Sequence, residues 1–250
     1  MLITALVAAV IAAGSPQALA SLGDEFDGSA SLSAWNVIQG DISDGGASTF
    51  GVHDGALTIV SSHASWVNNS RAFYLWKRVE GDFTVTARVR ADGLNGPVPN
   101  ANWSLSGLLL RAPVADGERE NWIGWTVGYV NGASVVERKT TRQSNSTLRL
   151  SLVPAGWIEL RAVRIGPVFA LLRRSPGKPW VLQGSYTRRD LPDALQVGID
   201  AQSGFDSAKA DLRSRVDWIR FAETGIPARQ RAAFLRGRRK LPSLIHYLTR

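Results

Sequence analysis

Residues 83–90 read FTVTARVR, an unbroken alternation of apolar and polar side chains. Successive side chains of a β-strand point to opposite faces, so this stretch buries one face and exposes the other to water. Similar short segments follow along the chain, separated by turns, and no helical periodicity occurs before Pro227. The other predicted strands lie at residues 52–60 (a hairpin turning at Asp54-Gly55), 105–111, 121–130, 134–141, 147–153, 157–164, 168–173, 180–182, 195–201 and 216–221. This order predicts an all-β sandwich of two sheets.

The start of the chain differs from its middle. Residues 2–13 are apolar and precede the small-x-small sequence Ala18-Leu19-Ala20, which predicts a secretory signal peptide over residues 1–20, cleaved after Ala20. The apolar run of about 12 residues is shorter than the ~20 that span a bilayer, and an uncleaved anchor is the alternative. One sandwich domain is then expected over residues 21–224. Export and the absence of cysteine together predict a secreted or periplasmic protein.

Basic residues concentrate in a tail over residues 225–250. Seven arginines and lysines lie there without an acid, and removing them from the net charge of +8 leaves +1 for the rest of the chain. Residues 227–235 predict a short helix, with Gly237 after its end. Two interpretations stay open, a solvated terminus and a contact with an anionic envelope surface. Nucleic acid is not expected as a partner, because an exported protein seldom meets it.

Several phrases in a fixed order, together with Trp35, resemble the concanavalin A-like lectin/glucanase superfamily. They lie at residues 25–27, 54–59, 79–85, 106–111, 121–122, 156–164, 197–199 and 216–221. The chain is most similar to small bacterial members of unassigned function, including those described as regulation-of-enolase-like. The resemblance implies a jelly roll of two antiparallel sheets with a concave sheet open to ligand, and for many relatives glycan binding. It implies no single activity, because this fold serves lectins, hydrolases, lyases and passive modules.

The strand at residues 121–130 supplies the first candidate ligand contacts. Trp122 and Thr126 share one face with glycines that alternate with them, whereas Trp125 lies on the core face. Such a face lets a ligand approach the backbone closely, and Trp122 is predicted to stack on a sugar ring beside Thr126. The alternative is that the glycines make room for a bulky neighbour and that Trp122 is part of the packing.

Four further residues complete the predicted ligand site. Trp103 follows a turn-rich loop at the rim, where aromatic side chains often contact ligands. Glu137 and Lys139 lie in a polar strand and would bond sugar hydroxyls, or form cross-strand ion pairs on a solvated face. Arg111 ends an apolar strand and points either into the groove or to the rim.

No catalytic residue is predicted. Retaining glucanases of the superfamily carry two acids two residues apart and a third acid on one strand, which brings carboxyl groups to ~5–5.5 Å. This chain has no such run. Glu118 and Glu120 have the spacing, but they flank Arg119 in a loop and are interpreted as solvated. A lyase site assembled from several strands would leave no local motif and stays open.

No cofactor or metal site is predicted either. Calcium is a property of the superfamily, and Asp24, Asp27 and Asp217 lie in the neighbourhoods where relatives bind it. No run of closely spaced acids supports such a site here.

The sequence therefore predicts an exported, non-catalytic carbohydrate-binding module that recognises an oligo- or polysaccharide on its concave sheet. A glycoside hydrolase or polysaccharide lyase of the same fold and an envelope-associated scaffold protein are the alternatives.

Overall fold

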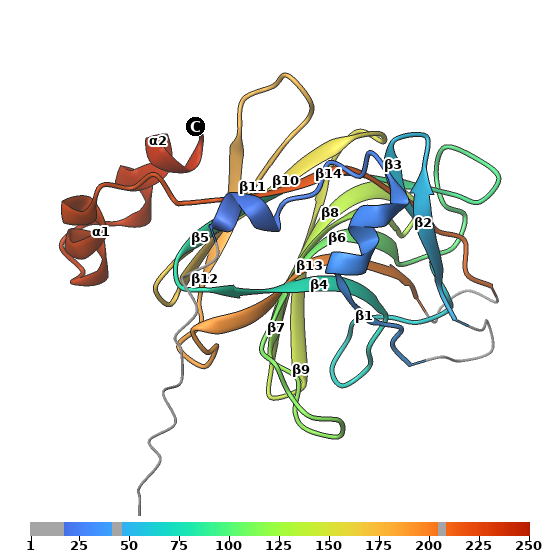
Figure 1. The fold of residues 1–250 in the computed structure, drawn as a ribbon, viewed down its shortest axis with the longest axis horizontal. Coiled ribbons are helices and arrows are strands. Elements are labelled where there is room, and N and C mark those ends of the chain that lie inside the picture. The colour runs from blue at the N-terminus through green and yellow to red at the C-terminus, as the bar shows by residue number, and fades with distance from the viewer. Residues whose placement is uncertain (1–17, 42–46, 205–208) are drawn as a thin grey trace, which may run out of the picture.

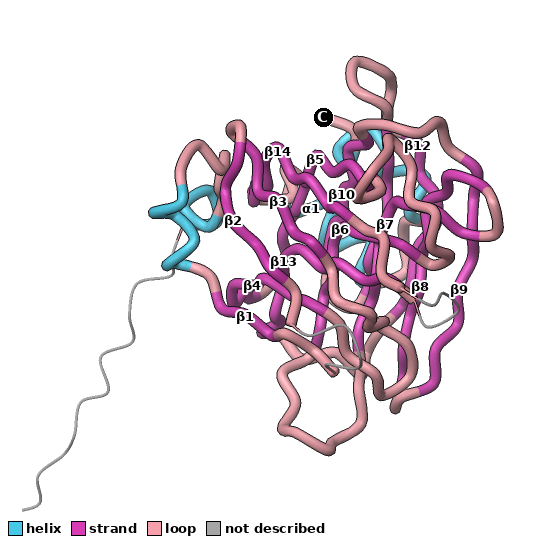
Figure 2. The backbone as a smooth tube through the Cα atoms, turned by 90° about the vertical axis from the view of Figure 1, so that its right-hand side faces the viewer, coloured by secondary structure: helices cyan, strands magenta, loops and turns pink. Residues whose placement is uncertain are grey.

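The computed structural model describes residues 18–41, 47–204 and 209–250, and it confirms the predicted sandwich of two antiparallel sheets (Figures 1 and 2). Sheet I has the order β1 (Asn36–Ile38), β4 (Phe73–Glu80), β13 (Ala194–Ser203), β6 (Ser104–Arg111), β7 (Trp122–Val130), β8 (Ala133–Arg142) and β9 (Asn145–Leu152). Sheet II has the order β12 (Val181–Thr187), β11 (Val168–Arg174), β10 (Ile158–Ile165), β5 (Phe83–Asp92), β14 (Arg213–Ala222), β3 (Ala56–Val60) and β2 (Thr49–His53).

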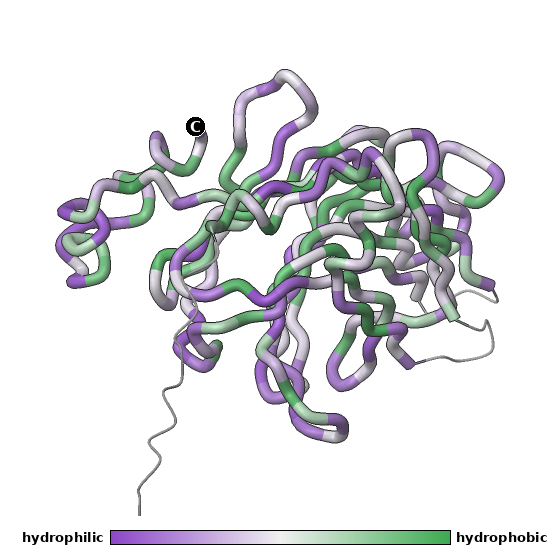
Figure 3. The backbone as a smooth tube through the Cα atoms, in the orientation of Figure 1, coloured by the Kyte–Doolittle hydropathy of each residue, from purple (hydrophilic) through white to green (hydrophobic). Residues whose placement is uncertain are grey.

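The core lies between the two sheets and is built by the alternation seen in the sequence (Figure 3). In β5, Phe83, Val85, Ala87 and Val89 are fully buried. Trp125 enters the core from β7, as predicted, and its indole N–H donates a 2.9 Å hydrogen bond to the Leu172 carbonyl of sheet II. The opposite faces of the strands are therefore the ones available for function.

Turns also follow the sequence. Asp54 and Gly55 both have positive φ angles, 52° and 67°, as a two-residue hairpin between β2 and β3 requires. The two 3₁₀ turns η1 (Leu19–Leu22) and η2 (Ser29–Ala34) precede β1. The predicted signal peptide falls largely on residues outside the described ranges, and its cleavage after Ala20 stays a prediction. None of the described helices is long and apolar enough to cross a bilayer.

The basic tail packs against the outer face of sheet II (Figure 1). It forms α1 (Ala228–Leu235), η3 (Leu241–Leu244) and α2 (Ile245–Leu248), so the predicted helix is confirmed, with Gly237 at a φ of 73° after its end. Leu244 and Leu248 are buried against strands β10 and β11. This tail is consequently part of the packed structure and not a solvated terminus.

Gly198 in β13 tests how closely the strands of sheet I approach. A Cβ at this position would collide with the Leu75 carbonyl oxygen of β4 and lie 2.8 Å from the Cα of Trp76. Since both are backbone atoms, Gly198→Ala should lower the free energy of unfolding by about 1–3 kcal/mol in urea denaturation. Gly28→Ala is the control, because Gly28 has an extended backbone and no atom within 4 Å of the added methyl group. Equal stability of the two variants would contradict this packing.

Candidate functional site

The outward face of sheet I is closed by a covering segment, residues 61–70, which crosses it from β13 to β9. Gln202 of β13 accepts hydrogen bonds of 2.9 Å from the Ser65 hydroxyl and from the Trp66 N–H. At the other end Asn68 and Ser146 of β9 exchange two bonds of 2.7 and 3.1 Å. The ligand face predicted from the sequence is therefore an internal surface in this structure.

Trp66 is the centre of this closure. It is 1% exposed and packs edge-on against Trp122, with ring centroids 6.0 Å apart, and against Tyr74 at 5.9 Å. The Lys139 ammonium donates to the Trp66 carbonyl at 3.1 Å. Aromatic packing of this kind excludes water from the polar groups below it.

A central row of residues runs beneath the covering segment across five strands. The register aligns Tyr74 of β4, Asp200 of β13, Gly107 of β6, Thr126 of β7 and Glu137 of β8. The four side chains of the row are 1% exposed or less. Two carboxyl groups, a hydroxyl and a phenol thus share one dry face.

Burial controls the protonation of both carboxyl groups. It raises the pKa of Asp200 to about 7, with a further contribution from the negative charge of Glu137. Main-chain N–H groups of Asp200 and Gly107 lower this pKa only in part, because they do not reach hydrogen-bond geometry. The Glu137 carboxylate pairs with Lys139 at 2.9 Å, yet burial outweighs that pair and still raises the pKa of Glu137.

Several atoms around the central row have no hydrogen-bond partner among the described residues. They are Thr126 Oγ1, Glu137 Oε2, both carboxyl oxygens of Asp200 and the indole nitrogen of Trp122. Buried polar groups are normally paired, and leaving one unpaired costs about 1–3 kcal/mol. This face therefore holds unused capacity for hydrogen bonds from water or a polar ligand.

Arg111 lies at the end of β6 in a separate ionic cluster. Its guanidinium donates two bonds to Glu120, at 2.7 and 2.8 Å, and one to Gln196 at 2.6 Å. Glu120 also accepts a 2.7 Å bond from Arg71. The interpretation of Glu120 as solvated is wrong, because the cluster buries this carboxylate to 1% exposure while the neighbouring Glu118 stays exposed.

The six predicted ligand residues occupy different positions. Trp122, Thr126, Glu137 and Lys139 lie together beneath the covering segment, and half-buried Trp103 borders them with its ring 5.8 Å from the Lys139 ammonium. Arg111 is occupied by Glu120 and Gln196, and its guanidinium lies 5.9 Å from the Trp66 ring. Their ligand-binding role stays a prediction.

Sequence reasoning missed Asp200, Tyr74 and Trp66. A signal for Asp200 was present, since the apolar alternation at residues 195, 197, 199 and 201 places it on the same outward face as Gln202. Trp66 carries no such signal, because it lies in a segment without periodicity and reaches sheet I only through the fold.

The spacing of the two carboxyl groups bears on chemistry. Three strand-to-strand steps separate Glu137 from Asp200, about 14 Å between backbones at ~4.8 Å per step. Glycoside hydrolysis needs carboxyl groups roughly 5–9.5 Å apart, so both side chains would have to lean toward each other. As built, the face is arranged for hydrogen bonding, with one carboxyl group whose pKa suits proton transfer near neutral pH.

The acids considered for calcium have other partners. Asp24 accepts a 2.8 Å hydrogen bond from the Trp35 indole, and Asp217 pairs with Arg88 at 3.0 Å. Across residues 18–41, 47–204 and 209–250, no three His, Asp or Glu side chains are grouped to hold a metal ion.

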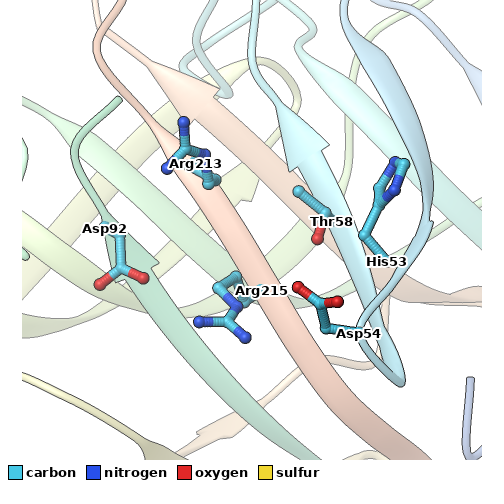
Figure 4. A pocket seen from close by; sticks show the side chains of 6 residues that line it. All are labelled: His53, Asp54, Thr58, Asp92, Arg213 and Arg215. Atoms are coloured by element: carbon cyan, nitrogen blue, oxygen red, sulfur yellow. The ribbon is translucent and has the colours of Figure 1, made fainter. Parts of the chain in front are cut away.

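A second cavity, of about 370 Å³, opens on the outer face of sheet II (Figure 4). Its wall carries acids and bases from the β2–β3 hairpin, β5 and β14: His53, Asp54, Thr58, Asp92, Arg213 and Arg215. Asp92 is paired with Arg90 at 2.6 Å, and Arg215 lies 5.7 Å from the Trp157 ring. None of the six predicted ligand residues lines this cavity.

No protein-family model and no curated protein matches this sequence. Solved structures do share the fold. A functionally unknown protein from Saccharomyces cerevisiae is 14% identical with a TM-score of 0.57, over 77% of this chain and 97% of that protein. The GH43 protein BlXynB from Bacillus licheniformis is 16% identical with a TM-score of 0.62, over 80% of this chain. The GH43B protein from the Bacteroides ovatus xyloglucan locus is 16% identical with a TM-score of 0.60, over 83% of this chain.

This chain spans only 39% of the length of each of the two GH43 proteins. At this level of identity the likeness establishes the fold. The chain has the two-sheet antiparallel sandwich that occurs in GH43 glycoside hydrolase structures.

Glu120→Gln tests the ionic cluster. Removing one charge of a buried pair leaves Arg111 uncompensated, so we expect the free energy of unfolding to fall by about 3 kcal/mol in urea denaturation. The same substitution two residues away, Glu118→Gln, affects an exposed side chain and should change it by less than about 0.5 kcal/mol. Similar values for the two variants would mean that the cluster contributes nothing to stability.

Asp200 should make stability pH-dependent. With a pKa of about 7 in the folded state against the ordinary 3.8, the folded chain holds a proton that the unfolded chain has released. Stability from this group is therefore full below pH 3.8 and is lost as pH rises toward 7, by up to about 1.4 kcal/mol per pH unit. Asp200→Asn removes this loss, so its unfolding free energy should exceed that of wild type at pH 8 and converge with it near pH 4.

Asp193→Asn is the matched control for this comparison, because Asp193 is exposed. Its urea unfolding should follow wild type at every pH. Parallel curves for Asp200→Asn and wild type would contradict an ordinary carboxyl group buried in its neutral form.

Proposed function

We propose that this protein is an exported carbohydrate-binding module and that the outward face of sheet I is its binding face. The observation that supports this best is the set of unpaired polar atoms around the central row. Sugar hydroxyls both donate and accept hydrogen bonds. They would complement the acceptors Glu137 and Asp200, the hydroxyl of Thr126 and the donor of Trp122. The sandwich shared with GH43 structures is consistent with a polysaccharide ligand.

Access to this face requires the covering segment to move, because the central row is buried. The anchors of the segment are individual hydrogen bonds to Gln202, Lys139 and Ser146 and the packing of Trp66. A glycan would replace these contacts with its own hydroxyls and with a ring face against Trp122 or Trp66. Binding would therefore be coupled to opening, and the apparent affinity would be reduced by the rarity of the open state.

Glycan cleavage is the second candidate, and the central row favours it in one respect. Glu137 and Asp200 share one face, and Asp200, with its pKa of about 7, would be protonated for part of the time at neutral pH, as a general acid must be. The backbone separation argues for binding without cleavage, because the inter-strand distance is larger than a catalytic pair uses.

Thr126→Val tests the binding face without damaging the fold. It removes an unpaired hydroxyl of nearly the same shape, so the unfolding free energy should stay equal or rise. If the hydroxyl bonds a glycan, affinity for the polysaccharide that the wild type selects from a panel of neutral and acidic polysaccharides should fall about 3–10-fold, the value of one hydrogen bond. Isothermal titration calorimetry would measure this loss.

Thr58→Val provides the control on sheet II, where Thr58 lines the cavity of Figure 4. A loss of affinity in Thr58→Val and not in Thr126→Val would move the ligand to that cavity. Release of reducing ends from the bound polysaccharide by wild type and not by Asp200→Asn would favour cleavage. Absence of binding across the panel would overturn the proposal and favour a scaffold role.

A further inference from the structure

The C-terminal segment, residues 225–250, separates its apolar from its basic side chains. Its apolar residues pack on β10, β11 and β12, where Ile226, Leu244 and Leu248 are buried and Phe234 and Tyr247 are partly buried. Arg231 pairs with Asp82, and Arg161 of β10 donates to the main-chain oxygens of Leu248 and Arg250 at 2.9 and 2.6 Å. The segment is thus held on sheet II through its apolar face and these polar anchors.

The opposite side of the segment forms an arginine cleft. A hollow of about 620 Å³ is lined by Arg229, Gln230, Ala233, Arg236, Arg238 and Arg239, and exposed Lys240 follows in the chain. Within the described residues none of these five cations forms an ion pair; Arg236 donates only to the Ala232 carbonyl, within its own helix. No acidic residue follows Glu223 in the sequence.

This arrangement leaves positive charges concentrated and uncompensated. Four of the five lie within residues 236–240, where mutual repulsion disfavours the packed segment unless an anion binds. Guanidinium groups match carboxylate and sulfate groups through two parallel hydrogen bonds. Several of them side by side suit a repeating anionic polymer better than one small ion.

We propose that the arginine cleft binds an anionic polysaccharide bearing carboxylate or sulfate groups. A membrane is disfavoured as the partner, because the apolar side chains that would enter a bilayer already pack on sheet II. Single-stranded nucleic acid is disfavoured because no aromatic side chain lines the cleft for bases to stack on. This site lies on the opposite sheet from the central row and does not depend on the function proposed for that row.

The test uses the full chain and a fourfold variant, R229Q/R236Q/R238Q/R239Q. Its probes are dextran sulfate and polygalacturonate, with neutral dextran as the reference polymer. Wild type should bind both anionic polymers and not dextran, and its affinity should fall as salt rises. The variant should lose at least tenfold in affinity at low salt. Its plot of log K against log salt should be shallower by up to about 3, at roughly 0.7 per lost contact on a flexible single-stranded polyanion.

A charge-matched variant separates the cleft from the total charge. R119Q/R149Q/K178Q/R189Q removes four exposed cations elsewhere on the molecule, and its affinity should stay within about twofold of wild type. Equal losses in the two variants would overturn the proposal, as would tighter binding to phosphatidylglycerol vesicles or to duplex DNA than to both polysaccharides. Thr126→Val should leave this binding unchanged, so failure of either proposal is recognised independently of the other.

Discussion

The contact between Trp66 and Trp122 closes the outward face of sheet I, and the chemistry of that face depends on this closure. With the covering segment in place, Asp200, Thr126 and Glu137 lie in a dry environment at 1% exposure or less. Desolvation then raises the pKa of both carboxyl groups, and Lys139 compensates only Glu137. If the segment opened, water would restore ordinary pKa values and free the hydrogen-bonding groups of the row. Opening and ligand binding are therefore linked through the same atoms.

The two sheets carry different electrostatic roles. On sheet I the charges are internal and arranged in pairs, as in the Arg111–Glu120 cluster, where burial makes each unpaired charge costly. On sheet II and the C-terminal segment the charges are exposed and mostly basic, where water screens repulsion and allows an excess of one sign. A ligand of sheet I must supply hydroxyl groups, whereas a ligand of the arginine cleft must supply negative charge.

The sandwich was predictable because its strands are marked by local alternation, as in residues 83–90, and its turns by residues such as Asp54-Gly55. The candidate site was predictable in part. Thr126, Glu137 and Lys139 were placed on one face by their period, and the structure brings them together. The same period would have added Asp200. Neither the burial of Glu120 nor the closure by Trp66 could be predicted, since both depend on segments distant in sequence, with Arg71 and β13 as partners.

The sequence by itself determined the fold class, the strand faces and the concentration of basic residues in the C-terminal segment, because these follow from side-chain periodicity and composition. Only the tertiary structure decided that the polar face of sheet I is internal and that the apolar side of the C-terminal segment packs on sheet II. The physical reason is the same in both cases. Burial is a property of surfaces in contact, and the contacting surfaces come from parts of the chain that no local pattern connects.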